Sequence, residues 1–128
     1  MRTKGFSLLE LLITLLLLSI LMAIAYPNYQ AYLRRIHRQE ASLRLIQLST
    51  TLERYHFKYH TYEGATLADL NMPTDIGDLY HLAIDEQSQS NYNISAEPKF
   101  LDSDCGTLSV NAQQRKSISG WGTVASCW

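Results

Sequence analysis

The chain has 128 residues, of which 46% are hydrophobic, and a formal net charge of −1. This length gives room for one modest domain. From Glu40 onward six basic residues stand against eleven acidic ones, a net charge of −5. Such a balance argues against a broad surface for phosphate groups, so nucleic acid is not the default partner.

An apolar run begins close to the N-terminus. The segment from Phe6 to Ala25 reads FSLLELLITLLLLSILMAIA and contains one charged residue, Glu10. As a helix rising about 1.5 Å per residue, a run of this length crosses the hydrocarbon core of a bilayer, so it predicts a membrane segment. Ordinary signal cleavage is an alternative, because Ala23-Ile24-Ala25 has the small-x-small pattern of such sites.

Glu10 is the unusual residue of this run, because a carboxylate costs about 2.5–3.5 kcal/mol at mid-bilayer on insertion scales. One interpretation places Glu10 near a membrane face, where it reaches headgroup water. The other is that Glu10 neutralises a partner's charge during assembly. The position alone leaves both open.

The next segment predicts a long helix with one apolar face, because apolar residues recur at alternating spacings of four and three. They are Ala41, Leu45, Leu48, Leu52, Tyr55, Tyr59 and Tyr62. We expect this face to pack on the chain's own C-terminal sheet, and the helix to kink or loosen at Pro27. Its end is predicted near Tyr62, because Glu63-Gly64 is a stop signal. A basic cluster of Arg34, Arg35, His37 and Arg38 is expected to contact anionic headgroups or acidic neighbours.

Three segments after this helix predict strands by alternating or clustering apolar residues: 79–84, 91–96 and 107–110. Three or four antiparallel strands stacked on an amphipathic helix give a two-layer α+β fold, with the apolar half of the helix protruding. Residues 113–128 are predicted to be a loop, held by Cys127 and by packing of Trp121 or Trp128.

Cys105 and Cys127 have no CxxC pairing and no clustered ligands that would complete a zinc site. A disulfide is the simpler interpretation. Closing such a loop stabilises a fold by roughly 3 kcal/mol in the chain-entropy model and requires an oxidising compartment. We therefore expect the folded part to lie outside the cytoplasm.

Catalysis is not expected, because no nucleophile elbow, Ser-His-Asp arrangement or glycine-rich phosphate loop is present in the sequence. Glu53, His56 and His60 could share one helix face and hold a metal, but a solvated face is the simpler interpretation. We predict no cofactor and no metal.

The segment Lys4-Gly5-Phe6-Ser7-Leu8-Leu9-Glu10, followed by the unbroken apolar run, resembles the class III signal of type IV pilins and pseudopilins. The resemblance implies that a prepilin peptidase cleaves after Gly5 and methylates Phe6, while a leader of residues 1–5 stays cytoplasmic. Arg2 and Lys4 fit the positive-inside rule. Residues 6–27 would then be the membrane and filament-core helix, and 28–128 the periplasmic or extracellular head with the C-terminal half of the long helix.

The same resemblance gives Glu10 a partner: the free amine of Phe6 on a neighbouring subunit, which would set the axial register of a filament. Pro27 matches the proline that follows the anchor in type IV pilins. The expected partners are other pilin subunits, the prepilin peptidase, the inner-membrane assembly platform and, before assembly, the membrane. The expected location is the bacterial inner membrane for the precursor and a surface filament afterwards.

Four further segments look like PilE-type minor pilins: Tyr62–Leu67, Tyr92–Pro98, Cys105–Leu108 and the terminal Cys127-Trp128. This resemblance implies a structural subunit that supports pilus biogenesis, adhesion, twitching motility or DNA uptake. Two alternatives stay open. One is a ComP-like pilin that binds DNA, for which the region of the cysteines offers chiefly Arg115 and Lys116. The other is a pseudopilin of type II secretion.

Overall fold

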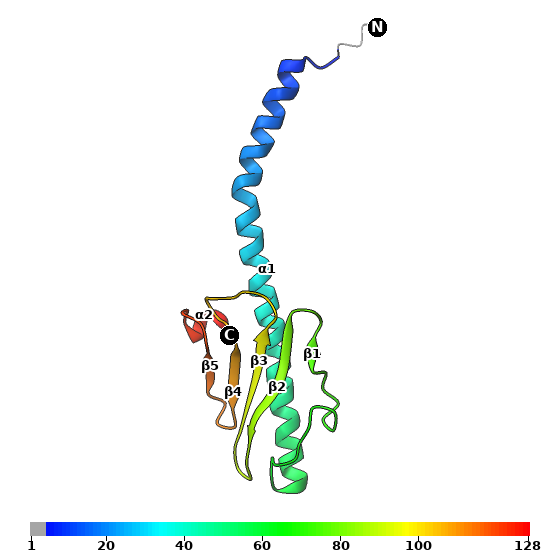
Figure 1. Ribbon diagram of the computed structural model, residues 1–128, viewed down its shortest axis with the longest axis vertical. Helices are drawn as coiled ribbons and strands as arrows, with labels where there is room; N and C mark the ends of the chain where they lie inside the picture. Colours follow the sequence, from blue (N-terminus) through cyan, green and yellow to red (C-terminus); the bar gives the residue numbers. More distant parts are fainter. Residues whose placement is uncertain (1–4) are drawn as a thin grey trace. The chain divides into compact units, whose positions relative to one another are not determined.

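The computed structural model of the chain describes residues 5–128, so Arg2, Lys4 and the rest of the expected leader before Gly5 lie outside the described residues. The elements follow in the order α1 (Leu8–Tyr59), β1 (Asp75–Ile76), β2 (Tyr80–Gln87), β3 (Tyr92–Pro98), β4 (Leu108–Asn111), β5 (Lys116–Ile118) and α2 (Val124–Cys127). Figure 1 shows their positions along the chain. The chain divides into two compact units, the first ending at Arg34 and the second running from Arg35 to Trp128.

The first unit consists of the N-terminal part of α1, where Leu is the commonest residue and a strong helix former. The helix runs without a break through Pro27. Proline has no N–H to donate to the carbonyl four residues earlier, so the ladder lacks one bond there. None of the most apolar 18-residue stretch of this helix is buried.

α1 ends at Tyr59, three residues before the predicted end. His60 follows with a φ of 58°, in the left-handed region, and its N–H donates to the carbonyl of His56 at 2.7 Å. A left-handed residue directly after the last helical one is a common way for a helix to stop. The predicted signal Glu63-Gly64 lies in the turn that comes next.

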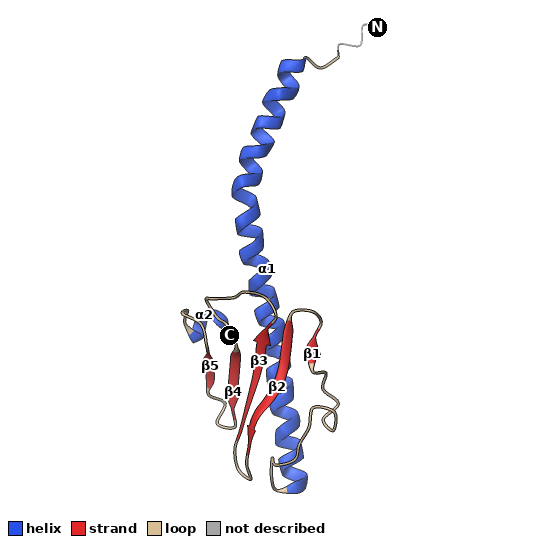
Figure 2. Cartoon of the chain, in the orientation of Figure 1, coloured by secondary structure: helices blue, strands red, loops and turns tan. Residues whose placement is uncertain are grey.

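The sheet is an antiparallel meander in which each strand pairs with the next along the chain, in the order β1-β2-β3-β4-β5. The central pair places Leu82 opposite Ala96 and Ile84 opposite Ile94, and the register then shifts between Ile84 and Glu86. Such a shift marks a bulge. Within the second unit, α1 lies across one face of this sheet (Figure 2).

The core lies between that part of α1 and the sheet. Leu45, Leu48 and Leu52 are fully buried, each in contact with the side chains that the strands direct inward. Those inward residues alternate along the strands and include Tyr80, Leu82, Tyr92, Ile94, Leu108 and Val110. A fully buried leucine contributes about 1.5–3 kcal/mol, so these three helix residues fix which face of α1 meets the sheet.

The predicted two-layer α+β architecture is confirmed, and so are its three central strands. Two short edge strands, β1 and β5, extend the sheet to five. The prediction of a loop over 113–128 is wrong in part, because β5 and α2 lie within it. The predicted apolar face of the helix is also corrected at one residue: Tyr59 belongs to that face, yet its side chain is 52% exposed.

Candidate functional site

The first candidate site is the uncovered apolar surface of α1 up to Arg34. Its most apolar window has a mean hydropathy of 2.7, which is high enough for a membrane-crossing helix by length and composition. The large apolar side chains from Leu8 to Tyr32 remain open to the surroundings, from 49% exposed at Ile13 to 78% at Leu8. An apolar surface of this extent needs a cover, and the two chemical possibilities are lipid and other apolar helices.

Glu10 lies in the first turn of α1, so its carboxylate stands where the helix dipole favours negative charge. The Glu10 side chain is exposed, and no hydrogen bond or ion pair to it occurs within residues 5–128. Its carbonyl accepts a hydrogen bond from Thr14 Oγ1 at 2.9 Å. Within this span, then, the carboxylate is held out by the helix and is available to an outside partner.

Gly5 and Phe6 precede the helix, which begins at Leu8. Phe6 is 82% exposed, so the expected scissile bond lies in accessible chain outside the helix. A Cβ added at Gly5 would meet nothing within 4 Å. Among the described residues, space alone therefore does not require a glycine at this position.

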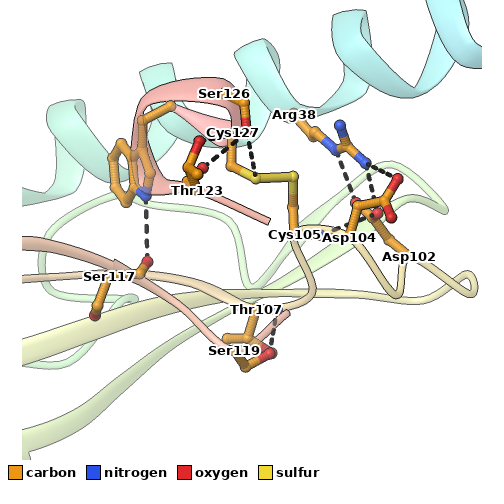
Figure 3. The surroundings of a disulfide bond; sticks show 11 residues. Arg38, Asp102, Asp104, Cys105, Thr107, Ser117, Ser119, Thr123, Ser126 and Cys127 are labelled. Atoms are coloured by element: carbon orange, nitrogen blue, oxygen red, sulfur yellow. Dashed lines mark hydrogen bonds and ion pairs between the residues drawn. A yellow bond between two sulfur atoms is a disulfide. The ribbon is translucent and has the colours of Figure 1, made fainter. Parts of the chain in front are cut away.

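The second candidate site is the C-terminal region around the disulfide between Cys105 and Cys127, whose Cα atoms are 5.7 Å apart (Figure 3). Three backbone hydrogen bonds hold residues 120–122, which follow β5, to the loop before β4. They run from the N–H groups of Gly120, Trp121 and Gly122 to the carbonyls of Cys105, Ser103 and Asp104, at 3.0, 3.1 and 2.7 Å. The loop that carries Trp121 is thus fixed along its backbone.

The two glycines of this loop are required by close approach. A Cβ added at Gly120 would lie 2.3 Å from the carbonyl oxygen of Asp104, and one at Gly122 would lie 2.7 Å from the same atom. Both distances are shorter than any ordinary contact. The prediction offered two alternatives, packing of Trp121 or of Trp128. Trp121, between the glycines, is 94% exposed, so the first alternative is not realised. Trp128 does pack against the core.

The prediction for Arg38 is corrected as well, because its guanidinium is paired within the fold and is not a free surface cation. Its guanidinium donates to Asp102 through Nε at 2.8 Å and Nη2 at 2.6 Å, and lies 3.9 Å from Asp104 (Figure 3). The Asp102 side chain is 2% exposed. The hydrogen bond to Asp102 raises the pKa of Arg38. His37, from the same predicted cluster, lies edge-on to the ring of Phe100.

Arg115 and Lys116, the predicted DNA-contacting residues, lie side by side at the start of β5 and are exposed. The ammonium of Lys116 lies 4.9 Å from the centre of the Trp128 ring, a cation–π arrangement. The indole N–H of Trp128 donates to the carbonyl of Ser117 at 3.2 Å, which orients that ring. In the part of the chain that the structure describes, neither cation has an acidic partner.

Glu53 and His56, the candidate metal ligands of the helix, have other contacts. Glu53 accepts hydrogen bonds from the hydroxyls of Tyr62 at 2.9 Å and Tyr92 at 3.4 Å. The His56 ring stacks on that of Tyr62 with centroids 4.4 Å apart. Burial, followed by the hydrogen bond to Glu53, raises the pKa of Tyr62 to about 12. His60 lies beyond the helix end and does not share its face.

Comparison with known proteins finds two family models that match. Residues 27–109 match the model described as type IV minor pilin ComP, DNA uptake sequence receptor. Residues 1–26 match the prokaryotic N-terminal methylation motif. Together with the apolar helix, this motif fits a membrane-anchored precursor.

Two solved structures share the fold. The non-core minor pilin PilV of Neisseria meningitidis is 17% identical with a TM-score of 0.60, over 72% of this chain and 92% of that one. A type IV pilin from Shewanella oneidensis is 19% identical with a TM-score of 0.55, over 74% of this chain and 97% of that one. At these identities the likeness extends to the fold alone.

Proposed function

The chain belongs to the type IV minor pilin family, and we propose that it is a structural subunit incorporated into a type IV pilus through its N-terminal helix. One observation carries this proposal: the helix up to Arg34 leaves its apolar surface uncovered. Lipid would cover it in the precursor and the helices of other pilus subunits in the filament. No catalytic role is part of the proposal, since pilin families are structural proteins.

Maturation is the first step of this proposal. A prepilin peptidase would remove residues 1–5 by cleaving between Gly5 and Phe6 and would methylate the new amino terminus. The match to the N-terminal methylation motif over residues 1–26 and the exposed chain before Leu8 support this step. Residues 6–27 would then form the filament-core helix and residues 28–128 the head. An inner-membrane assembly platform would insert the mature subunit into the filament, which extends to the cell surface.

Assembly is the second step. The carboxylate of Glu10 would pair with the amine of Phe6 on a neighbouring subunit, which satisfies both charges as lipid is exchanged for protein. A buried charge that lacks its partner is expensive, so the correct stagger is favoured and a wrong stagger is penalised. Pro27 would mark the exit of the helix from the apolar core.

The test compares Glu10→Ala with Glu40→Ala, which removes an exposed carboxylate outside the apolar run. We expect both variants in the membrane fraction, and only Glu10→Ala to be depleted from sheared filaments. Removing the carboxylate makes insertion into lipid easier, so a loss confined to the filament fraction isolates the pairing. Wild-type incorporation of Glu10→Ala would refute the role of this residue.

A second candidate function, as a receptor for DNA during uptake, is favoured by the description of the matching family model. In this chain the surface for it would be Arg115 and Lys116 beside Trp128, a cationic pair next to an oriented aromatic ring. The net charge of −5 from Glu40 onward opposes it, so any DNA contact would have to be local.

Gel shifts of the full chain with double-stranded DNA test this candidate across a salt series. Affinity should fall steeply with salt and should weaken in the variant Arg115→Gln/Lys116→Gln. The control is Arg54→Gln/Lys58→Gln, which removes the same charge from another part of the head. Equal weakening by both variants, or no salt-sensitive binding, would contradict a DNA site at β5.

A further inference from the structure

The groove between the end of α1 and the loop before β1 is a third feature of the head, and the proposed functions leave it unused. It has a volume of about 640 Å³ and is lined on the helix side by Arg54, Tyr55, Lys58 and Tyr59. Its loop side includes Asp69 and Asn71. All of these residues belong to the second unit of the chain.

Arg54 and Lys58 place two positive charges on one edge of the groove, because residues four apart lie on the same face of a helix. Both are exposed, and among residues 5–128 neither forms an ion pair. Lys58 lies over the ring of Tyr59, with its nitrogen 5.0 Å from the ring centre. Because neither cation has a carboxylate partner among these residues, both remain available to an anion from outside.

Aromatic surface lies directly beside these charges. The rings of Tyr55 and Tyr59 are 4.5 Å apart and tilted by 42°. The hydroxyl of Tyr55 donates to the carbonyl of Glu63 at 3.4 Å, which anchors this ring to the turn after the helix. Tyr59 is 52% exposed, so the ring of Tyr55 is held while that of Tyr59 stays partly open to the surroundings.

The loop side of the groove is preformed. Leu70 and Met72 are buried and tie the loop to the core. Thr66 Oγ1 donates to the carboxylate of Asp69 at 2.6 Å and accepts from the Asp69 N–H at 3.2 Å. Asn71 adopts a φ of 52°, a left-handed conformation, and its N–H donates to the carbonyl of Ala68 at 3.1 Å. The polar groups at the groove therefore stand on a fixed backbone.

The mixture of charges selects the ligand chemistry. Two cations and one carboxylate leave a single net positive charge, which suits a monoanion and penalises a run of phosphodiesters that would meet Asp69. A carboxylate and an amide bond hydroxyl groups, and an aromatic face covers the apolar side of a sugar ring. We propose that this groove binds an acidic monosaccharide unit, with its anionic group at Arg54 and Lys58, its ring against Tyr59 and its hydroxyls toward Asp69 and Asn71.

Saturation-transfer NMR of the full mature chain, in a zwitterionic detergent without sugar, tests this site. The probes are methyl glucuronide, a hexose sulfate and neutral methyl glucoside. At least one anionic probe should bind saturably and about tenfold more tightly than the neutral one, because hydrogen bonds to charged groups are the stronger ones. The glucuronide and the sulfate arms identify which anionic group is preferred.

Variants locate the binding. Arg54→Gln/Lys58→Gln should reduce affinity for the anionic probe about tenfold and bring it to the level of the neutral one. Arg44→Gln, which removes a cation of α1 outside the groove lining, should leave the affinity unchanged. Thermal unfolding checks that both variants fold. The site is overturned if neither anionic probe saturates, if the neutral sugar binds equally well, or if the Arg54/Lys58 variant binds as the wild type does. Binding of double-stranded DNA that depends on Arg54 and Lys58 would also overturn it. None of these results bears on filament incorporation.

Discussion

The guanidinium of Arg38 and the carboxylate of Asp102 meet through two hydrogen bonds of 2.8 and 2.6 Å, although 64 residues separate them in the chain. Arg38 comes from α1 and Asp102 from the loop that leads to Cys105. The Cys105 N–H lies 3.4 Å from the same carboxylate. This pair therefore ties α1 to the loop before Cys105, close to the disulfide that joins Cys105 to Cys127.

Removing one member of this pair should destabilise the head. Asp102→Ala leaves the 14%-exposed guanidinium of Arg38 without its main partner. The loss of one side of a buried pair costs about 3 kcal/mol, and we expect a clearly lower Tm in thermal unfolding. Asp104→Ala is the matched control, because its carboxylate is 76% exposed and 3.9 Å away. Equal Tm values for the two variants would contradict a structural role for the pair.

Gly120→Ala should weaken the disulfide region, because its Cβ would lie 2.3 Å from the carbonyl oxygen of Asp104, a backbone atom that cannot turn aside. Overpacking of this kind costs about 1–3 kcal/mol, measurable by chemical denaturation. Trp121→Ala, at the neighbouring residue, removes a side chain that is 94% exposed and should leave stability unchanged. A Gly120→Ala protein as stable as Trp121→Ala would show that the loop shifts freely.

Alkaline pH should destabilise the fold through two tyrosines. Burial is the largest cause that raises the pKa of Tyr62 and of Tyr80 from the ordinary value of about 10 to about 12 in each case. Their contribution to stability is fully present below the unfolded pKa and is lost as pH rises from about 10 to about 12. In a pH titration, the absorbance of tyrosinate should continue to rise between about pH 10 and pH 12, and this rise should be smaller in Tyr62→Phe. A titration that Tyr62→Phe leaves unchanged would be evidence against the shift.

Gly5→Leu should block maturation without disturbing the fold, since residue 5 lies before the helix and a Cβ added there meets nothing within 4 Å among the described residues. Intact-protein mass spectrometry should then find a precursor longer by about five residues, as the expected cleavage after Gly5 implies. Ser7→Thr, two residues beyond the cleavage point, is the control and should be processed normally. Processing of Gly5→Leu at the wild-type position would contradict the assigned cleavage site.

Sequence reasoning succeeded where a pattern repeats over several residues. The buried leucines at 45, 48 and 52 mark the packed face of α1, and alternation along Tyr80, His81 and Leu82 marks a strand. β1 has two residues and β5 three, which is too short for any alternation to register. α2 has four residues, which is too short for a helical period to be recognised in the sequence.

Long-range pairing and surface placement were the parts that the sequence could not supply. Nothing local to Arg38 indicates that its partner is Asp102, so the sequence alone predicts a cation of a surface cluster. A tryptophan side chain is large and largely apolar, so packing is expected for Trp121. Its loop is fixed by backbone hydrogen bonds with the side chain exposed. The groove between Arg54 and Asp69 also arises only when α1 and the loop after it are brought together.

Mass spectrometry of sheared surface filaments tests the central claim most directly. The account predicts that the chain is present among filament subunits, begins at Phe6 and carries a methyl group on that amino terminus. Recovery of the chain only in the membrane fraction, with Met1 still attached, would contradict it.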